Sequence, residues 1–116
     1  MIVLKDIKTK LELDPKSCQD MNELREQIDQ LDREIVNLLA LRKTYMDRAA
    51  ELKKHRNLVR DDKRVVDVIK KVSEHATKNG ADPKLVADLY RTMIEWSINY
   101  EFDQFDKINS EMGESA

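Results

Sequence analysis

Residues 21–56 read MNELREQIDQLDREIVNLLALRKTYMDRAAELKKHR, and this stretch decides the fold. It contains neither Gly nor Pro, so no residue in it interrupts a helix. Its apolar side chains recur at alternating steps of four and three residues, which is the spacing of helices that pack at a shallow angle along a heptad seam. The pattern predicts one long amphipathic helix. The seam consists of Leu24, Ile28, Leu31, Ile35, Leu38, Arg42, Tyr45, Ala49 and Leu52.

Arg42 interrupts this seam at a position where the pattern requires Leu or Ile. Taking a guanidinium group out of water costs several kcal/mol unless an anion meets it. We therefore expect either a polar cavity beside Arg42 or a ligand that supplies the anion.

Two further cations are related to Arg42 by helical geometry. Lys53 follows Arg42 by eleven residues, which at about 100° per residue returns it to within about 20° of the same face. Arg25 precedes Arg42 by seventeen residues, or roughly 25 Å of helix axis, too far for one small ligand to contact both. A symmetric dimer would solve this, because each helix could give Arg42 and Lys53 to one site and Arg25 to the other. Taken singly, Arg25 and Lys53 are also typical of ordinary solvated helix charges.

The composition of the 116 residues indicates one all-α domain. Aromatic residues make up only 5% of the chain, and two Gly and two Pro leave few turns. Helical patterning over about 75 residues in three segments gives a small core for a monomer. Obligate oligomerisation is therefore expected.

Charge and hydropathy argue against several classes of partner. The 21 basic and 23 acidic side chains nearly cancel to a net charge of -2, which favours neither nucleic acid nor an anionic membrane. No apolar run approaches the roughly 20 residues that span a bilayer, and the N-terminus lacks the apolar core and cleavage site of a signal peptide. We expect a cytoplasmic protein. The single cysteine, Cys18, can form no intrachain disulfide and has no His or Cys cluster beside it.

Breaks in the periodicity set the expected ends of the long helix. Residues 1–20 form an arm that we leave unassigned. Asp20 is a candidate N-cap, with Glu23 three residues later completing a capping-box pattern, and Ser17 is the competing cap. The helix is expected to end near residues 55–57, where the apolar spacing is lost.

Two more helices follow, one short and one of medium length. Asn79-Gly80 is a stop signal for the short helix, and Asp82-Pro83 supplies the N-cap and first residue of the next. The third helix is expected to continue to about Phe105. We assign residues 21–106 to one helical domain and residues 107–116 to a flexible tail. The apolar faces comprise Val65, Ile69, Val72 and Ala76 in the short helix, and Val86, Leu89, Tyr90, Met93, Ile94, Ser97 and Tyr100 in the third.

The polar side chains on these helices form an anion-binding inventory. Ser97 falls on the apolar face of the third helix, and Glu101 lies one turn further along the same side. The sequence has no Ser-His-Asp pattern, phosphate-binding Gly loop or metal cluster, and His55 and His75 lie in charged stretches typical of exposed surface. Such a site, without nucleophile or metal, suits a polyanionic substrate whose reaction is limited by conformation and charge redistribution. The inventory comprises Arg25, Arg42, Lys53, Asp61, Arg64, Ser97 and Glu101.

The stretch LREQIDQLDREIVNLLALR, followed by Lys53 and by VRDDKR, resembles the all-helical chorismate mutases, whose first helix begins with an L-R-x-x-I-D-x-[IL]-D pattern. The resemblance covers roughly residues 21–105. It implies an intertwined homodimeric helical bundle with two sites, each of which borrows the first-helix Arg of the other chain. The residues that fall on family binding positions are Arg25, Arg42, Lys53, Asp61, Arg64, Ser97 and Glu101.

The reaction that the resemblance implies is the Claisen rearrangement of chorismate to prephenate in aromatic amino-acid biosynthesis, with no cofactor and no covalent intermediate. Arg42 and the partner's Arg25 would clamp the two substrate carboxylates. Lys53 would donate to the ether oxygen as its C–O bond breaks. Glu101 could donate there only when protonated, because an ionised carboxylate is an acceptor only. Asp61, Arg64 and Ser97 would complete the polar wall.

One residue departs from the family pattern. Many members have a Glu directly after the residue that corresponds to Arg64, where it accepts the ring hydroxyl of the substrate, whereas this chain has Val65. The hydroxyl contact would then come from Asp61, a backbone group or water. The related isochorismate-pyruvate lyases, which share the fold and the arginine clamp, are therefore an alternative. A non-catalytic helical dimerisation module is a third alternative. Such a module would need the heptad pattern, but it would have no need for Arg42, Lys53, Ser97 and Glu101 together.

Overall fold

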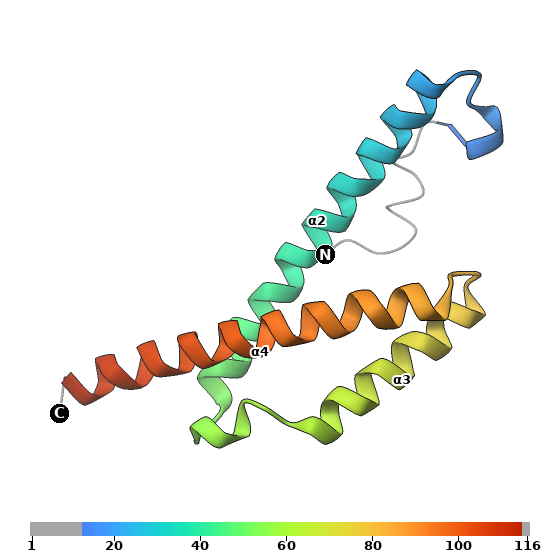
Figure 1. The fold of residues 1–116 in the computed structure, drawn as a ribbon. Helices are drawn as coiled ribbons and strands as arrows, with labels where there is room; N and C mark the ends of the chain where they lie inside the picture. Colours follow the sequence, from blue (N-terminus) through green and yellow to red (C-terminus); the bar gives the residue numbers. More distant parts are fainter. Residues whose placement is uncertain (1–12, 115–116) are drawn as a thin grey trace. The chain divides into compact units, whose positions relative to one another are not determined.

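The computed structural model describes residues 13–114, and their side chains as far as residue 110. Three α-helices dominate it: α2 (Met21–Leu52), α3 (Asp62–Lys78) and α4 (Pro83–Glu114) (Figure 1). Two short 3-10 helices, η1 (Pro15–Ser17) and η2 (Arg56–Leu58), precede α2 and α3. No strand occurs in residues 13–114, so the prediction of an all-α chain with three helices is confirmed.

The chain divides into two compact units, Met1–Thr44 and Tyr45–Ala116, and α2 contributes residues to both. In the first unit, α2 leaves much of its predicted seam uncovered. Ile28 and Ile35 are 46% and 47% exposed, and Leu31 is 38% exposed. None of the described apolar side chains of this unit is buried. Exposed apolar side chains along one face of a helix are typical of an interaction surface.

The start of α2 is fixed by a pair of capping interactions. The carboxylate of Asp20 accepts a hydrogen bond from the backbone N–H of Glu23 at 2.9 Å, which confirms Asp20 as the N-cap. The Glu23 carboxylate reaches back, but it accepts from the N–H of Gln19 at 2.7 Å, one residue before the cap. In a standard capping box this carboxylate would accept from the N–H of the N-cap residue itself, so the second hydrogen bond is made one residue earlier here. Residues 1–12 of the predicted arm lie outside the described residues.

The end of α2 corrects the expected boundary at residues 55–57. The helix stops at Leu52, and the N–H of Lys53 makes its last helical bond, to the carbonyl of Ala49 at 3.1 Å. His55 is extended, with φ -136° and ψ 143°, and it opens the 3-10 turn η2. This turn places Val59 in the core at 3% exposure. Burial of Val59 explains the early stop, because a continued helix would have carried this side chain away from the core.

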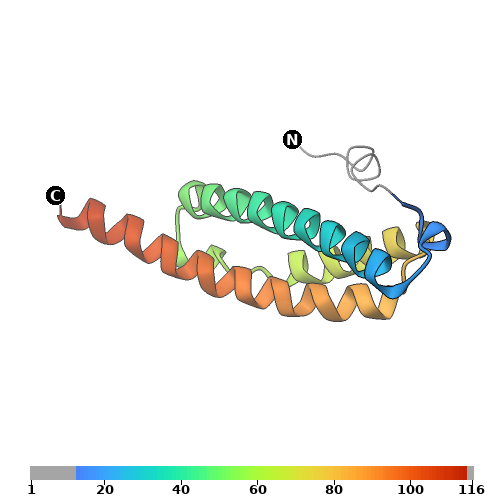
Figure 2. The same ribbon diagram turned by 90° about the horizontal axis from the view of Figure 1, so that it is seen from above.

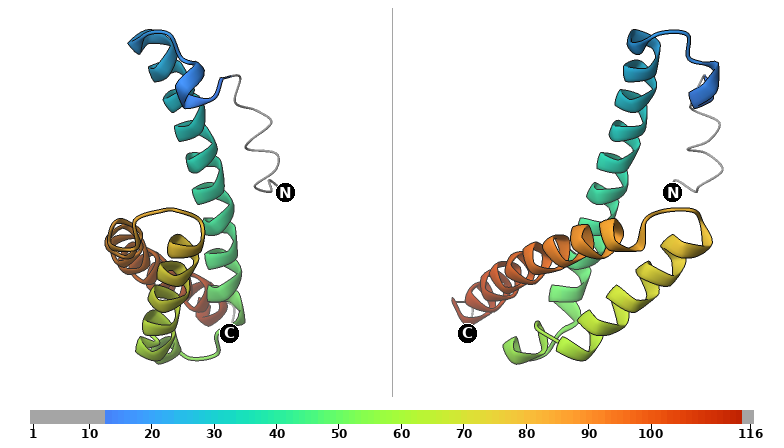
Figure 3. Two further views of the ribbon diagram at one scale, coloured as in Figure 1. Left: turned by 90° about the vertical axis from the view of Figure 1, so that its right-hand side faces the viewer. Right: turned by 45° about the vertical axis from the view of Figure 1, so that its right-hand side comes forward.

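The turn between α3 and α4 follows its sequence signals. Gly80 has φ 75°, and the N–H of Ala81 bonds to the carbonyl of Ala76 at 2.9 Å, which closes the end of α3. The Asp82 carboxylate then accepts from the N–H of Lys84 at 2.8 Å and starts α4. The two helices consequently lie antiparallel and side by side (Figure 3). Both predicted boundaries are confirmed.

The core of the second unit lies between α3, α4 and η2. Val59, Ile94, Ile98 and Phe105 form its buried cluster, and half-buried apolar residues pack around them: Val65, Val68, Ile69, Tyr90 and Phe102. The predicted inward face of α3 is confirmed, since its members are half-buried or buried. On α4, Leu89 departs from the prediction at 61% exposure, and Ala87 is buried at 7%.

The third helix is longer than expected. We predicted its end at about Phe105, but α4 continues to Glu114 and appears as one unbroken helix in Figure 2. Ile108 is half-buried, and the amide of Asn109 donates to the Phe105 carbonyl at 2.8 Å. These side chains stabilise the helix beyond Phe105, and the heptad pattern did not indicate this. The division into a domain of residues 21–106 and a flexible tail stays a prediction.

Candidate functional site

Lys53 and Glu101 meet inside the second unit. Lys53 directly follows α2, Glu101 lies in the middle of α4, and the Lys53 ammonium group donates to Oε1 of Glu101. The Glu101 side chain is 5% exposed and that of Lys53 is 28% exposed. A carboxylate this deeply buried requires a cation beside it, and Lys53 supplies that cation.

The Lys53 ammonium has a second acceptor on the loop that leads to α3. Its Nζ donates to the backbone carbonyl of Val59 at 3.4 Å. A lysine ammonium carries three N–H donors, so these two bonds leave one for a ligand. Part of the Lys53 side chain also remains exposed.

Ser97 lies one turn before Glu101 on α4, and both residues are buried, at 5% and 4% exposure. Their neighbours on the same face, Ile94 and Ile98, belong to the hydrophobic core. A hydroxyl and a carboxylate are therefore placed at the edge of an otherwise apolar cluster. The sequence correctly predicted that Ser97 and Glu101 share an inward face.

A second polar pair, between α2 and α4, was not predicted from the sequence. The hydroxyl of Tyr100 on α4 donates to Oδ1 of Asp47 on α2. The ring of Tyr100 stacks on Trp96, with 5.2 Å between ring centroids and 6° between planes. This pair ties the last turns of α2 to α4. Asp47 carried no signal in the sequence, because it lies two residues from the seam positions Tyr45 and Ala49 and its pattern is that of a surface carboxylate.

Asp61 and Arg64 lie at the first turn of α3 and interact locally. Asp61 is the N-cap of α3, and its Oδ1 accepts from the N–H of Arg64 at 3.1 Å. The Arg64 guanidinium pairs with Asp67 at 2.8 Å, and its side chain is 62% exposed. Hydrogen bonds from Lys71 and then from Arg64 lower the pKa of Asp67 below its usual range. In the structure Asp61 thus caps α3 and Arg64 pairs with Asp67, and that these two residues also contact a ligand stays a prediction.

Arg25 and Arg42 belong to the first unit. Arg25 is exposed, whereas Arg42 is half-buried and has an interaction within the structure. The partial burial agrees with the position of Arg42 on the seam. That these two arginines join Lys53 and Glu101 in one site stays a prediction.

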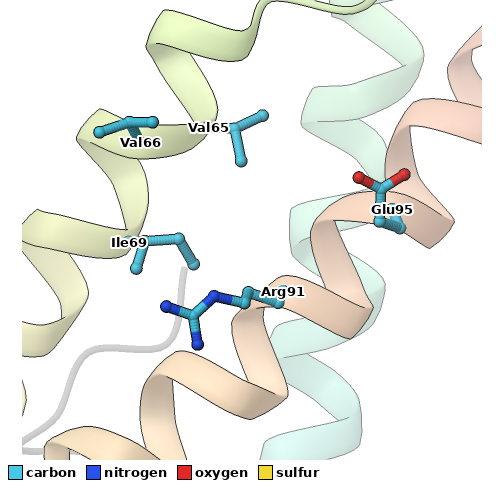
Figure 4. A pocket seen from close by; sticks show the side chains of 5 residues that line it. All are labelled: Val65, Val66, Ile69, Arg91 and Glu95. Carbon is cyan, nitrogen blue, oxygen red and sulfur yellow. The ribbon is translucent and has the colours of Figure 1, made fainter.

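A pocket of about 470 Å³ opens between α3 and α4 in the second unit (Figure 4). Its walls are Val65, Val66 and Ile69 from α3 and Arg91 and Glu95 from α4. None of these five belongs to the predicted site. Val65 lines the pocket from the position where the resemblance led us to expect a Glu in many relatives, and its side chain offers no hydrogen-bond acceptor.

Neither a metal centre nor a membrane span was found in the described part of the chain. Among residues 13–114, no three His, Cys, Asp or Glu side chains gather closely enough to hold a metal ion. Across the same residues, each helix is too short or too polar to traverse a bilayer.

Comparison with known proteins adds two findings. The family model described as chorismate mutase type II matches residues 24–102, more than half of the chain. The isochorismate pyruvate lyase of Pseudomonas aeruginosa is 30% identical over 84 residues, which cover 72% of this chain and 83% of that protein. The matched region contains every residue of the predicted site. The chain belongs to the chorismate mutase type II family.

Proposed function

We propose that this protein is a chorismate mutase, which converts chorismate to prephenate. The observation that carries the proposal is the ion pair between Lys53 and the buried Glu101. The Lys53 ammonium uses two of its three N–H donors, for Glu101 and for the Val59 carbonyl, and keeps the third for a ligand. Glu101 itself would be a second donor if it carried a proton. Family membership supports the same substrate class. The reaction requires no external reactant, because the ether C–O bond breaks while a C–C bond forms within one molecule.

Lys53 has the central role in the proposed mechanism. Negative charge grows on the ether oxygen as its C–O bond breaks, so a hydrogen bond from Lys53 is stronger in the transition state than in the bound substrate. Arg42 and the partner subunit's Arg25 would clamp the two carboxylates and hold the enolpyruvyl group over the ring. Ser97, Asp61 and Arg64 would complete the polar wall around the substrate.

Glu101 would need to change its role when the substrate binds. In the structure it accepts a hydrogen bond from Lys53. To donate to the ether oxygen together with Lys53, Glu101 would have to carry a proton, because an ionised carboxylate is an acceptor only.

The proposal includes a homodimer with shared active sites. The exposed apolar residues of α2, among them Ile28, Leu31 and Ile35, support it because a second copy of the chain would cover them. The axial distance of roughly 25 Å between Arg25 and Arg42 supports it further, because one small ligand cannot contact both on one helix. In the dimer, Arg25 would serve the site of the other chain.

An isochorismate pyruvate lyase is the second candidate, and two observations favour it. The relative from Pseudomonas aeruginosa carries that name. In addition, Val65 offers no acceptor for a ring hydroxyl where many mutases have a Glu. The two substrates differ in the position of this hydroxyl, so the residue at position 65 bears directly on the choice.

Incubation of the purified protein with chorismate and, separately, with isochorismate tests both candidates. The proposal predicts prephenate from chorismate and no release of pyruvate. Release of pyruvate from isochorismate, without prephenate formation, would establish the lyase instead. Lys53→Ala is the control for contaminating enzymes, since it should reduce by about a hundredfold or more whichever activity belongs to this protein. Lack of turnover with either substrate by the folded protein would contradict both candidates.

A further inference from the structure

The loop between α2 and α3 is tied to α4 at two points. Arg60 forms two hydrogen bonds with the Glu95 carboxylate, at 3.1 Å and 2.6 Å. Arg56 likewise forms two with Asp106, at 2.9 Å and 3.3 Å, and its guanidinium lies 4.4 Å from the centre of the Phe102 ring. Both arginines thus fix the loop by paired hydrogen bonds of defined direction, which a single point charge would not provide.

The two ties enclose the segment of α4 that carries Glu101. Glu95 and Asp106 are eleven residues apart, which is roughly 16 Å along a helix axis. Glu101 lies between them. The loop is therefore held across the same stretch of α4 that binds the Lys53 ammonium.

Val59 lies between the two arginines and connects them to Lys53. Its side chain is 3% exposed in the core, its N–H bonds to the Arg56 carbonyl at 3.1 Å, and its own carbonyl accepts from Lys53. A shift of the loop would move this carbonyl and so change the direction of the Lys53 ammonium. Since Lys53 is the first residue after α2, the helix alone does not fix its side chain.

We propose that Arg56 and Arg60 are positioning residues, which hold the loop on α4 so that the Val59 carbonyl orients the Lys53 ammonium towards the substrate. This inference rests on the proposed function, in which Lys53 contacts the reacting oxygen. Both arginines would act through the loop and not by contact with the substrate. Their effect on the rate arises because a small displacement of a catalytic donor weakens the interaction that it makes in the transition state.

The exposure of these pairs makes the inference testable in a folded protein. The side chains of Arg56 and Asp106 are 60% and 51% exposed, and those of Arg60 and Glu95 are 41% and 54% exposed. Ion pairs this exposed contribute little to global stability. Removing them should therefore leave the fold intact while it releases the loop.

The test compares the double variant Arg56→Gln and Arg60→Gln with wild type and with Arg48→Gln. Arg48 is a matched control, because it forms an equally exposed pair with Glu51 at 2.8 Å within α2 and does not hold the loop. The double variant should lose about tenfold in kcat with a smaller change in KM, whereas Arg48→Gln should retain wild-type values. Thermal unfolding followed by circular dichroism checks that all three proteins remain folded.

A measurement without substrate separates this inference from the proposed function. The NMR signal of the Lys53 ammonium group can be assigned by its absence from Lys53→Met. In wild type this signal should be sharp, because hydrogen bonds hold the group, and Arg48→Gln should show the same signal. In the double variant the signal should weaken, and the amide proton of Val59 should exchange faster. Absence of turnover in wild type would refute the proposed function alone, since this signal still reports the orientation of Lys53.

The charge swap of Arg60→Glu with Glu95→Arg provides the rescue. If the tie positions Lys53, the swap should restore both the ammonium signal and kcat relative to Arg60→Glu alone. An unchanged signal and unchanged kcat in the double variant would overturn the inference. A swap that restores the melting temperature without restoring the signal would do so as well.

Discussion

Lys53 and Glu101 depend on each other for charge compensation. Glu101 is almost fully buried, and Lys53 is the cation that the structure places on it. Removing one member of a buried ion pair leaves the other as an uncompensated charge, which is more costly than removing both. Substitutions at this pair should therefore affect stability as well as activity.

Lys53→Ala and Arg42→Ala should each reduce kcat/KM by about a hundredfold or more, which corresponds to roughly 3 kcal/mol. Their effects on stability should differ. Lys53→Ala should lower the melting temperature, because it leaves the Glu101 carboxylate buried without a cation. Arg42→Ala should not lower it in this way, because it removes a charge from an apolar seam. Steady-state kinetics and thermal unfolding of both variants provide the measurements.

The combination of Lys53→Ala with Glu101→Gln separates the two effects of the lysine. It should recover much of the lost stability, because the stranded charge is gone, but it should recover no activity. Wild-type turnover in Lys53→Ala and Arg42→Ala would return both residues to an ordinary structural role.

Glu101→Gln tests the proposed donor role of the carboxyl group. A glutamine amide donates at every pH, whereas a carboxyl group donates only when protonated. We expect kcat of the wild type to fall from mildly acidic to alkaline pH, and kcat of Glu101→Gln to depend less on pH. Superimposable profiles of the two proteins would leave Lys53 as the sole donor to the ether oxygen.

The elements of the second unit are joined by turns and loops whose conformations depend on a few residues. Gly80 ends α3 with a positive φ of 75°, and an added Cβ would meet nothing within 4 Å. A substitution at Gly80 is therefore penalised by its backbone conformation and not by a clash.

Gly80→Ala should destabilise the protein by about 1 kcal/mol, the typical cost of a left-handed conformation for a residue with a Cβ. Gly80→Asn should cost less, because Asn tolerates this conformation better. Chemical denaturation of the two variants and wild type measures the difference. Equal stabilities of all three would show that the turn relaxes at no cost.

The tie between Arg60 and Glu95 should make stability depend on pH in the acid range. Hydrogen bonding by Arg60 is the main reason that the pKa of Glu95 lies below its usual range. A carboxylate with a lowered pKa stabilises the fold above its unfolded-state pKa, and this stabilisation is lost as the pH falls through the folded-state value. The melting temperature of wild type should therefore decrease on acidification through this pair, but only slightly, because the pair is exposed.

Glu95→Gln should reduce the acid dependence of the melting temperature, and Arg60→Gln should reduce it to a similar extent. The double variant should show no further reduction, because both substitutions remove the same interaction. Melting temperatures between neutral pH and about pH 3 provide the comparison, since this range spans the ordinary titration of carboxyl groups. Additive effects in the double variant would mean that the two residues act independently.

At the scale of the whole molecule, the exposed seam of α2 is the feature that the single chain leaves unexplained. Its apolar side chains form no buried cluster among the described residues of the first unit. An obligate dimer would supply the missing surface, and it would also allow Arg25 of one chain and Arg42 of the other to meet in one site.

Mixing Arg25→Ala with Arg42→Ala chains tests this arrangement. Each variant alone should be inactive, whereas heterodimers formed after subunit exchange should contain one intact site and recover a fraction of the activity. Light scattering determines the mass of each protein in solution. A fully active monomer, or absence of recovery after verified exchange, would refute the shared site.

The sequence by itself determined the three helices, their best-marked boundaries and the inward face that carries Ser97 and Glu101. These features are local, because periodicity, N-caps and a glycine at positive φ act within a few residues of chain. The family also follows from the sequence, since the spacing of the polar residues along the helices is its signature.

Only the tertiary structure decided which polar groups meet. Lys53 pairs with Glu101 and Val59, Tyr100 with Asp47, and Arg60 with Glu95, over separations that no periodic pattern encodes. It also ended α2 at Leu52, because burying Val59 in the core outweighed the helical propensity of the residues before it. Long-range packing thus set the details of the site, whereas local sequence set the elements that carry it.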